Sequence, residues 1–304
     1  MASLKEIKGR IASVRNTQKI TSAMRMVASA KLHHTQGMTE AFLRYKDELK
    51  KIIDSLQLTV DSSMRTDDQQ GDSQLSTLLI PVSSNSGLCG AFNSNIAKAT
   101  MQRVQELESQ GKQVRLLPIG KKIAHELKKT GRDFHTDFVD MLDKIEKSNT
   151  YTDVATLVAF AEELRQNNEI GEVEFLYHHF KSMGTQVIQR QNISPPPTSP
   201  KGEGNDSDGN SFPLGKAGKG LDYLTEPSPS ELLASLFPRL LNAQVYGILL
   251  DSLTSEHAAR MMAMQTADDN ANDLLKELTL LYNKTRQQTI TNELIDIMGG
   301  KVER

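Results

Sequence analysis

The stretch that decides the fold is residues 230–298, SELLASLFPRLLNAQVYGILLDSLTSEHAARMMAMQTADDNANDLLKELTLLYNKTRQQTITNELIDIM. Its one proline, Pro238, lies near the start, and the glycine pair 299–300 follows as a typical helix stop. Its spacing predicts one helix of roughly 70 residues, about 100 Å long. Such a helix must extend beyond a domain whose radius of gyration would be about 20 Å, and it needs a partner. The residues that recur three and four apart along its expected contact face are Met264, Ala267, Ala271, Leu274, Leu278, Leu281 and Thr285.

A second long helix is predicted at the other end of the chain. Ser3 with Glu6 fits an N-terminal capping box, as Ser228 with Glu231 does for the last helix, and no proline interrupts residues 3–57. We expect residues 1–57 and 227–304 to pair as a long antiparallel two-helix coiled coil. The expected contact face of the first helix is Leu4, Ile7, Ile11 and Val14, then the weaker Ile20, Met24, Val27, Ala28 and Leu32, then Phe42, Tyr45, Leu49, Ile52 and Leu56.

Charge favours the same pairing. Residues 1–36 carry seven Lys and Arg against one Glu, whereas residues 251–298 carry eight Asp and Glu against four Lys and Arg. An antiparallel pair would place these stretches side by side. Because an exposed ion pair contributes only a few tenths of a kcal/mol, we expect charge to set the register more than the stability.

The middle of the chain predicts an α/β domain over residues 75–192. Short apolar runs alternate with helical stretches, which favours a doubly wound, mostly parallel sheet with helices on both faces. A polar connector, 58–74, precedes the domain, and a segment rich in proline and glycine, 193–226, follows it and is expected to be flexible. The expected strands are 75–82, 113–119, a weaker 133–139, 172–180 and 185–192, and the expected helices are 91–110, a helix through Leu127, and 152–166.

Composition narrows the class of protein. Hydrophobic residues make up 38% and aromatic residues 5% of the 304, with no tryptophan, which suits long paired helices better than a compact enzyme. The formal net charge of −2 selects no polyanionic partner. The single Cys89 excludes an internal disulfide. A membrane-spanning helix needs a run of about 18 apolar residues, and no apolar run in this sequence is that long. The sequence also does not open with the apolar region of a signal peptide. We therefore expect a protein that faces the cytosol.

No catalytic, cofactor-binding or metal-binding residues are expected. The serine-rich turn at 83–90 lies between a strand and a helix, yet it matches neither G-x-G-x-x-G nor G-x-x-x-x-G-K-[ST]. The histidine pairs 33–34 and 178–179 are chain neighbours that point in different directions, so neither pair can chelate one metal ion. The basic first helix has no aromatic residue within 1–41 on which bases could stack, so no nucleic-acid partner is expected.

Three separated motifs, in the same order, resemble the γ subunit of F-type ATP synthases. The opening KEI at 5–7 and IASVRNTQKIT at 11–21 resemble that family's N-terminus, and GLCG at 87–90 with Asn93 resembles its central motif. Its C-terminal signature is matched by SE at 255–256, AARM at 258–261, AM at 263–264, DN at 269–270, YNK at 282–284, RQ at 286–287, IT at 290–291 and EL at 293–294. The resemblance covers the chain apart from 193–220.

The resemblance implies a rotor and no catalytic role. The paired helices would thread a ring of three α and three β subunits, and the globular domain would be the foot beside the ε subunit on the membrane c-ring. Proton or sodium flow would turn this stalk and drive the catalytic β sites through their states. The implied location is the cytoplasmic face of a bacterial inner membrane. The residues implied to contact β or to form the coupling face are Met24, Arg25, Arg260, Arg286, Gln287, Thr291 and Glu293.

Two features qualify this expectation. Residues 193–220, within the expected foot, are richer in proline and glycine than the family suggests, and the chain lacks the cysteine pair of the redox-regulated chloroplast forms. The alternative function is a nucleotide-dependent α/β enzyme with a coiled-coil arm. Saturable binding of ATP or NAD by the isolated chain would favour that alternative.

Overall fold

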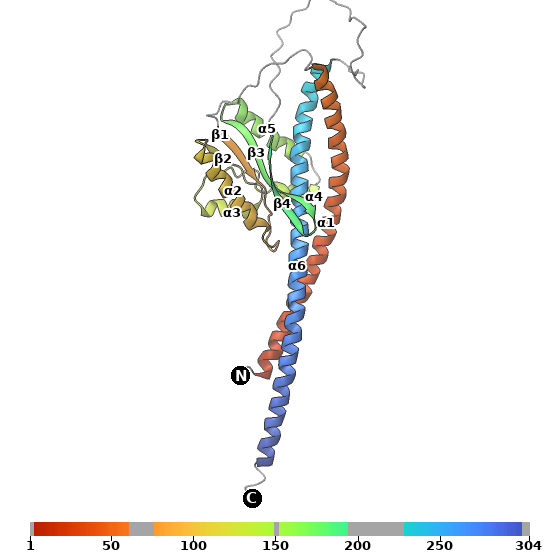
Figure 1. The fold of residues 1–304 in the computed structure, drawn as a ribbon, viewed down its shortest axis with the longest axis vertical. Coiled ribbons are helices and arrows are strands. Elements are labelled where there is room, and N and C mark those ends of the chain that lie inside the picture. The colour runs from red at the N-terminus through yellow and green to blue at the C-terminus, as the bar shows by residue number, and fades with distance from the viewer. Residues whose placement is uncertain (1–2, 61–75, 149–151, 194–227, 300–304) are drawn as a thin grey trace, which may run out of the picture.

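Two long helices form a rod that is the longest dimension of the molecule (Figure 1). The computed structural model describes residues 3–60, 76–148, 152–193 and 228–299. Helix α1 (Leu4–Val60) has 57 residues and α6 (Pro229–Gly299) has 71, and the two run antiparallel side by side. In both expected capping boxes the serine caps the helix: Ser3 Oγ accepts a hydrogen bond from Glu6 N, and Ser228 Oγ accepts one from Glu231 N, each over 3.3 Å. The expected coiled coil is therefore present.

The contact face of α1 differs in detail from the expected one. Ile7, Ala28, Leu32, Leu49 and Leu56 are buried as expected. The expectation was wrong for Ile20, Val27 and Tyr45, which are exposed, and Ile53 takes the buried position predicted for Ile52. On α6, Met264 and Ala271 are buried, whereas Leu274 and Leu281 are half exposed. The small and polar middle of α1 offered several apolar positions close together, so spacing alone did not select the contact face.

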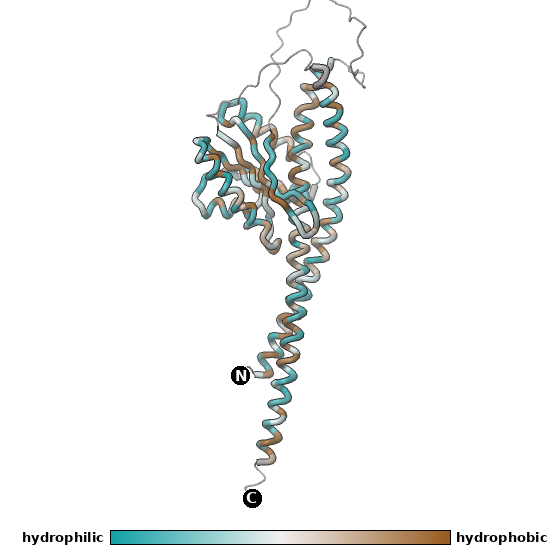
Figure 2. The backbone as a smooth tube through the Cα atoms, viewed as in Figure 1, coloured by the Kyte–Doolittle hydropathy of each residue, from teal (hydrophilic) through white to brown (hydrophobic). Residues whose placement is uncertain are grey.

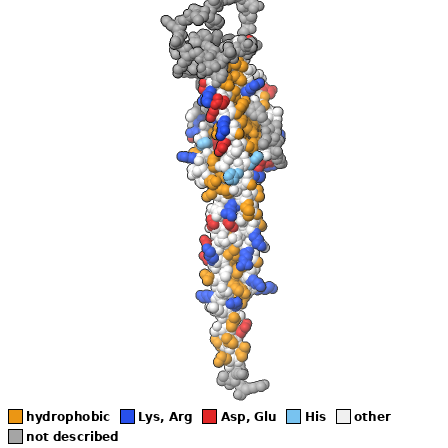
Figure 3. Space-filling view, turned by 90° about the vertical axis from the view of Figure 1, so that its right-hand side faces the viewer, with side chains coloured by type: hydrophobic (Ala, Val, Ile, Leu, Met, Phe, Trp, Pro, Cys, Tyr) orange, Lys and Arg blue, Asp and Glu red, His pale blue; other side chains and the backbone are white. Residues whose placement is uncertain are grey.

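Uncharged side chains mark the register between the two helices. Gln18 donates to Asn272 over 2.7 Å, and the hydroxyls of Thr39 and Thr254 lie 3.4 Å apart. Within the described residues no ion pair joins α1 to α6, so the complementary charge of the two helices does not act through direct pairs. Most basic side chains of α1 are instead exposed, and Lys and Arg side chains are visible along the surface of the rod (Figure 3).

A four-stranded mixed sheet forms the globular part beside the rod. The strands are β1 (Ser76–Pro81), β2 (Val114–Leu116), β3 (Ile170–Ser182) and β4 (Thr185–Asn192), in the order β2-β1-β3-β4. Strand β1 pairs parallel with β2 and β3, and β4 returns antiparallel to β3. The sheet is thus mostly parallel, as predicted, and its central strands are the most hydrophobic part of the globular region (Figure 2).

Helices cover both faces of the sheet. On one face, α2 (Phe92–Ser109) and α3 (Lys121–Lys129) pack on Leu79, Leu116 and Leu176. On the other face, α4 (Met141–Ser148), α5 (Thr152–Gln166) and the rod helix α6 pack on the alternate side chains of β1 and β3. Because successive side chains of a strand point to opposite faces of the sheet, the side chains of β1 and β3 pack into two separate cores.

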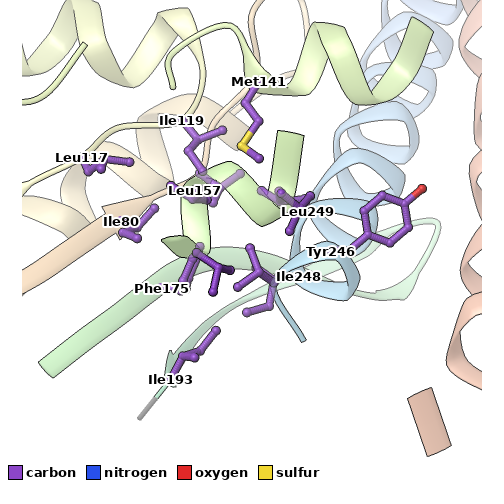
Figure 4. Close-up of a cluster of buried hydrophobic side chains, with 14 of the residues drawn as sticks. Ile80, Leu117, Ile119, Met141, Leu157, Phe175, Ile193, Tyr246, Ile248 and Leu249 are labelled. Atoms are coloured by element: carbon purple, nitrogen blue, oxygen red, sulfur yellow. The ribbon is translucent and has the colours of Figure 1, made fainter. Parts of the chain in front are cut away.

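The rod helix α6 belongs to the core of the globular part. Ile248 and Leu249 lie beside Phe175 of β3 and Leu157 of α5 (Figure 4). Polar contacts strengthen this attachment: Phe180 N donates to Asp251 Oδ1 over 2.8 Å, and His179 Nδ1 lies 2.5 Å from Asp251 Oδ2. Each buried aliphatic side chain contributes about 2 kcal/mol. The buried α6 residues of this core are Leu241, Val245, Tyr246, Ile248, Leu249, Leu250 and Leu253.

This packing explains the apolar character of α6. By length and composition the helix could cross a membrane, with an 18-residue window of mean hydropathy 1.2, and 44% of that window is buried inside the protein. A helix that packs on a sheet and on a second helix needs apolar side chains around much of its circumference. The composition of α6 therefore has an explanation within the fold.

The expected strand at 133–139 is wrong. Residues 132–136 have no regular secondary structure and 137–140 form a turn, held by His135 N donating to Leu116 O over 2.9 Å. The alternation that suggested a strand comes from Phe134 and Phe138, which pack against the two different cores. Helix α4 was not predicted, because its eight residues contain too few turns for a periodic signal. Most of the connector 58–74 and of the segment 193–226 lies outside the described residues.

Among the described glycines, Gly120 has the closest neighbouring atoms. It has a φ of 105°, and a Cβ there would overlap Ser83 O and lie 2.6 Å from Ser83 Oγ. Both conditions exclude larger residues at the step from β2 to α3.

We predict that Gly120→Ala lowers the free energy of unfolding by about 2 kcal/mol or more, because both the left-handed φ and the clash oppose a Cβ. Urea unfolding measures the effect. Gly37→Ala in α1 is the matched control: nothing lies within 4 Å of a Cβ there, and helix propensity predicts a gain of about 0.5–1 kcal/mol. Equal stabilities for the two variants would contradict the prediction.

Candidate partner-binding surfaces of the rod

The seven candidate residues fall into two groups along the rod. Met24 and Arg25 lie on α1 opposite the stretch of α6 around Gln265, and Arg260 lies on α6 beside Ser86 of the globular part. The other four, Arg286, Gln287, Thr291 and Glu293, lie near the C-terminal end of α6. Residues 260 and 286 are separated by about 39 Å along the helix axis at 1.5 Å per residue. The structure therefore presents two surfaces and not one site.

The middle group is only partly accessible. Met24 and Arg25 are half-buried against α6, and Arg25 donates a hydrogen bond to Gln265 Oε1. The residue of α6 that Arg25 contacts, Gln265, lies more than one helical turn beyond Arg260. The Met24 thioether carries no charge, and the charged Arg25 guanidinium is half-buried and directed to the neutral amide of Gln265. Such a surface can touch several partners without binding one tightly.

Arg260 is engaged within its own chain. Its side chain is 11% exposed, and Nη2 donates to Glu256 Oε1 over 2.7 Å and to Ser86 Oγ over 2.6 Å. Burial raises the pKa of Glu256, and the Arg260 charge and hydrogen bond oppose that rise. The resemblance alone did not indicate that Arg260 reaches the turn at residues 83–90.

By the register that Gln18 and Asn272 set, Arg286 and Gln287 lie level with the start of α1. Thr291 and Glu293 lie on the part of α6 that continues past it (Figure 1). Arg286, Gln287, Thr291 and Glu293 are all exposed, and Thr291 Oγ1 donates to Gln287 O over 2.9 Å. Sequence reasoning missed the exposed apolar side chains around them, which the space-filling view shows gathered at the end of the rod (Figure 3). Their exposed fractions run from 48% to 71%, for Ile290, Leu294, Ile295, Ile297 and Met298. The sequence could have indicated them, because the apolar residues of the last predicted helix continue beyond the length of its predicted partner helix.

The serine-rich turn uses its polar groups internally. Ser83 Oγ accepts from Ile123 N over 3.0 Å, and Asn85 Oδ1 accepts from Lys121 N over 2.9 Å. These are amides at the start of α3, the groups that a phosphate would need. Cys89 is buried, and its Sγ accepts from Asn93 Nδ2 over 3.1 Å. The turn is therefore built as a helix cap.

Two buried histidines, His178 of β3 and His257 of α6, contact side chains of α2 and α4. His178 stacks on Phe92 with ring centroids 4.0 Å apart, and burial lowers the pKa of His178 to about 4. Burial also lowers the pKa of His257 to about 4, although Glu146 at 3.6 Å opposes the shift. Glu146 in turn pairs with Lys31 of α1 over 2.6 Å. Among the described residues no group of three or more His, Cys, Asp and Glu could hold a metal ion.

Comparison with known proteins decides the family. A family model described as "ATP synthase" matches residues 3–302. A protein of Parabacteroides distasonis named "ATP synthase gamma chain" is 48% identical over 300 residues, which cover 99% of this chain and 98% of that protein.

The chain belongs to the ATP synthase gamma chain family.

Other members of the gamma chain family agree over the full length. The protein of that name from Bacteroides fragilis strain YCH46 is 44% identical over 303 residues, covering 99% of this chain and all of that protein. The fold is shared with a chain of the Euglena gracilis mitochondrial ATP synthase, solved as its OSCP/F1/c-ring assembly. That chain has a TM-score of 0.64 at 20% identity, over 98% of this chain and 93% of the other.

We predict that the free energy of unfolding falls as the pH falls from 6.5 towards 4. The unfolded chain takes up protons there, whereas folded His178, with its lowered pKa, stays neutral. This residue contributes up to about 3 kcal/mol of the loss. Urea unfolding across this pH range should show a shallower pH dependence for His178→Phe. Phe92→Leu, which leaves the imidazole in place, should keep the steeper dependence; the same slope in both variants would contradict the assignment.

Proposed function

We propose that this chain is the central-stalk rotor subunit of an F-type ATP synthase and is itself non-catalytic. The rod turns inside a ring of three α and three β subunits, and ion flow through the membrane c-ring drives the turning. Each β site is then carried through its conformational states during ATP synthesis. ATP hydrolysis turns the same rod in the other direction.

The observation that carries this proposal is the shape of α6. Helix α6 pairs with α1 from its first turns onward, packs into the globular core over residues 241–253, and ends as a single exposed helix with an apolar tip. That arrangement can carry torque from a foot to a distant bearing. The family membership over the full length gives the partners that such a rod serves.

The two surfaces have separate roles in this proposal. Met24, Arg25 and Arg260 form or support the coupling face beside the β subunits. Arg286, Gln287, Thr291 and Glu293 contact the upper part of the ring. The basic side chains on the outside of α1 face acidic loops of β. The two arginines of the coupling face are engaged within the chain, Arg25 by Gln265 and Arg260 by Glu256, so their charges are less available to hold the rotor at one angle.

The globular part serves as the foot in this proposal. Residues 75–192 form the α/β domain between the two rod helices, with 58–74 and 193–226 as its connecting segments. Its edge strand β4 has mostly exposed or half-exposed residues, which leaves the edge open to the ε subunit or the c-ring. The chain would be peripheral to the membrane, on the cytoplasmic face of a bacterial inner membrane, held there through the complex. No nucleic acid or cofactor takes part.

Co-assembly tests the proposal. The chain should co-purify with a 3:3 hexamer of its own α and β subunits and restore ATP-driven ion transport to vesicles that carry the membrane sector. Tight, saturable binding of ATP or NAD by the isolated chain, without hexamer assembly, would instead support the alternative enzyme. The coupling ion follows from repeating the transport assay with proton and sodium gradients.

We predict that deleting residues 288–304 lowers ion transport per ATP hydrolysed without lowering the melting temperature of the globular part. The described side chains of that stretch are exposed or half-buried and contribute nothing to the cores. Calorimetry and vesicle transport measure the two quantities. Loss of the main thermal transition would contradict the separation of tip and core.

We predict that Met24→Lys impairs coupling more than assembly, because a new charge on the coupling face can pair with an acidic β loop and hold one angle. The ratio of ion transport to ATP hydrolysis measures coupling, and co-purification measures assembly. Met24→Leu keeps the volume without the charge and should behave as wild type. An unchanged transport ratio in Met24→Lys would rule out this position as part of the coupling face.

A further inference from the structure

The turn at 83–90 is fixed firmly at both ends. At its start, Ser83 and Asn85 are hydrogen-bonded to the first amides of α3. Ser84 N donates to Asn93 Oδ1 over 3.1 Å, and at the far end Asn93 Nδ2 donates to the buried Cys89 over 3.1 Å. Between these anchors lies the exposed segment Ser86–Gly87–Leu88.

Leu88 is held in a costly position in the middle of this segment. Its φ is 64°, a left-handed conformation that disfavours a leucine, and its side chain is 61% exposed. Left-handed backbone at a non-glycine residue costs on the order of 1 kcal/mol and persists only where the surroundings hold it. An exposed leucine in such a conformation contributes nothing to this chain's own core. The backbone conformation of Leu88 therefore needs contacts that hold it in place, and its side chain needs a contact outside this chain.

Part of the support lies within the turn, where Ser84 Oγ donates to Ser86 O over 2.6 Å, and the rest comes from the rod. Arg260 Nη2 on α6 donates to Ser86 Oγ over 2.6 Å, and this is the side-chain contact that ties the exposed segment to α6. Glu256, one turn earlier, holds the same guanidinium at 2.7 Å, and its own side chain is only 9% exposed. A buried, charge-assisted pair has a well-defined geometry, so the guanidinium is aimed before it meets Ser86. Glu256, Arg260 and Ser86 form a chain of contacts from the rod to the turn, which we call the turn clamp.

We propose that Arg260 is a positioning residue and that the turn clamp fixes Leu88 as the contact presented to the subunits around the rod. This inference rests on the proposed rotor function. It reassigns Arg260 from a direct partner contact to a support, and it adds Leu88 to the coupling surface. The clamp also ties the turn to the rod, so Leu88 keeps one position relative to α6 as the rod turns.

Spin labelling tests the positioning step on the full-length chain. The label is attached to Leu88→Cys in a Cys89→Ser background, which removes the chain's one native thiol and keeps a side-chain oxygen to accept from Asn93. Ser86→Ala and Arg260→Gln should each increase the mobility of the label, and the double variant should add little beyond either one. Arg286→Gln, at the rod tip, is the matched control and should leave the mobility unchanged. Unaltered mobility in both clamp variants would overturn the proposal.

Coupling in the assembled complex tests the consequence. Ser86→Ala, Arg260→Gln and Leu88→Ala should each lower ion transport per ATP hydrolysed by about twofold to tenfold with wild-type assembly. Ser86→Ala and Leu88→Ala should keep the wild-type melting temperature, whereas Arg260→Gln, which leaves the buried Glu256 without its charged partner, should lower it and is assayed below its own transition. Arg260→Lys keeps the charge but loses the two-partner geometry, and should fall between wild type and Arg260→Gln. If wild type couples and all three variants couple equally well, the inference fails while the rotor function stands. Failure of the wild-type chain itself to assemble would instead refute the proposed function.

Discussion

The structure depends on the burial of one helix against two different neighbours. Along residues 241–253, α6 packs on the sheet and on α5, while its other side faces α1. Removing this double contact would expose apolar surface on both the rod and the globular part. The foot and the rod therefore share a core, and their relative orientation is set by packing, not by a linker. A rotor requires this property, because torque applied to the foot must reach the tip without being lost in a flexible joint.

Local patterns allowed the rod to be predicted from the sequence, because each of its determinants lies within one helix. Heptad spacing, capping serines and the absence of interior prolines act over a few residues, and they gave α1 and α6 nearly their observed lengths. The parallel strands followed from short apolar runs in the same way. The prediction of buried residues failed where apolar residues lie on two neighbouring faces of one helix. Ile20 and Val27 on α1 are examples, since both lie beside positions that do contact α6. The segment at 133–139 failed because Phe134 and Phe138 serve two cores without a strand between them.

The prediction of the candidate surfaces depended more on the resemblance to a known family than on the spacing of residues in this sequence. Exposure at the tip residues Arg286 and Glu293 agrees with a contact role, yet nothing in their spacing pointed to one. Arg260 shows what resemblance leaves out, because its partner Ser86 lies 174 positions away in the chain. No local pattern encodes such a contact. The exposed leucine of the central motif was likewise invisible until the φ angle of Leu88 and the bonds around it were known.

The uncharged hydrogen bonds between α1 and α6 affect how the shaft responds to its surroundings. Amide and hydroxyl contacts, such as those of Gln18 with Asn272 and of Thr39 with Thr254, are not screened by dissolved ions. The charges on the outside of the shaft are screened over about 10 Å at ordinary ionic strength. A change in salt concentration would therefore alter how strongly the surrounding subunits are attracted to the shaft. The alignment of the two strands of the shaft would stay the same, so this design separates internal rigidity from external friction.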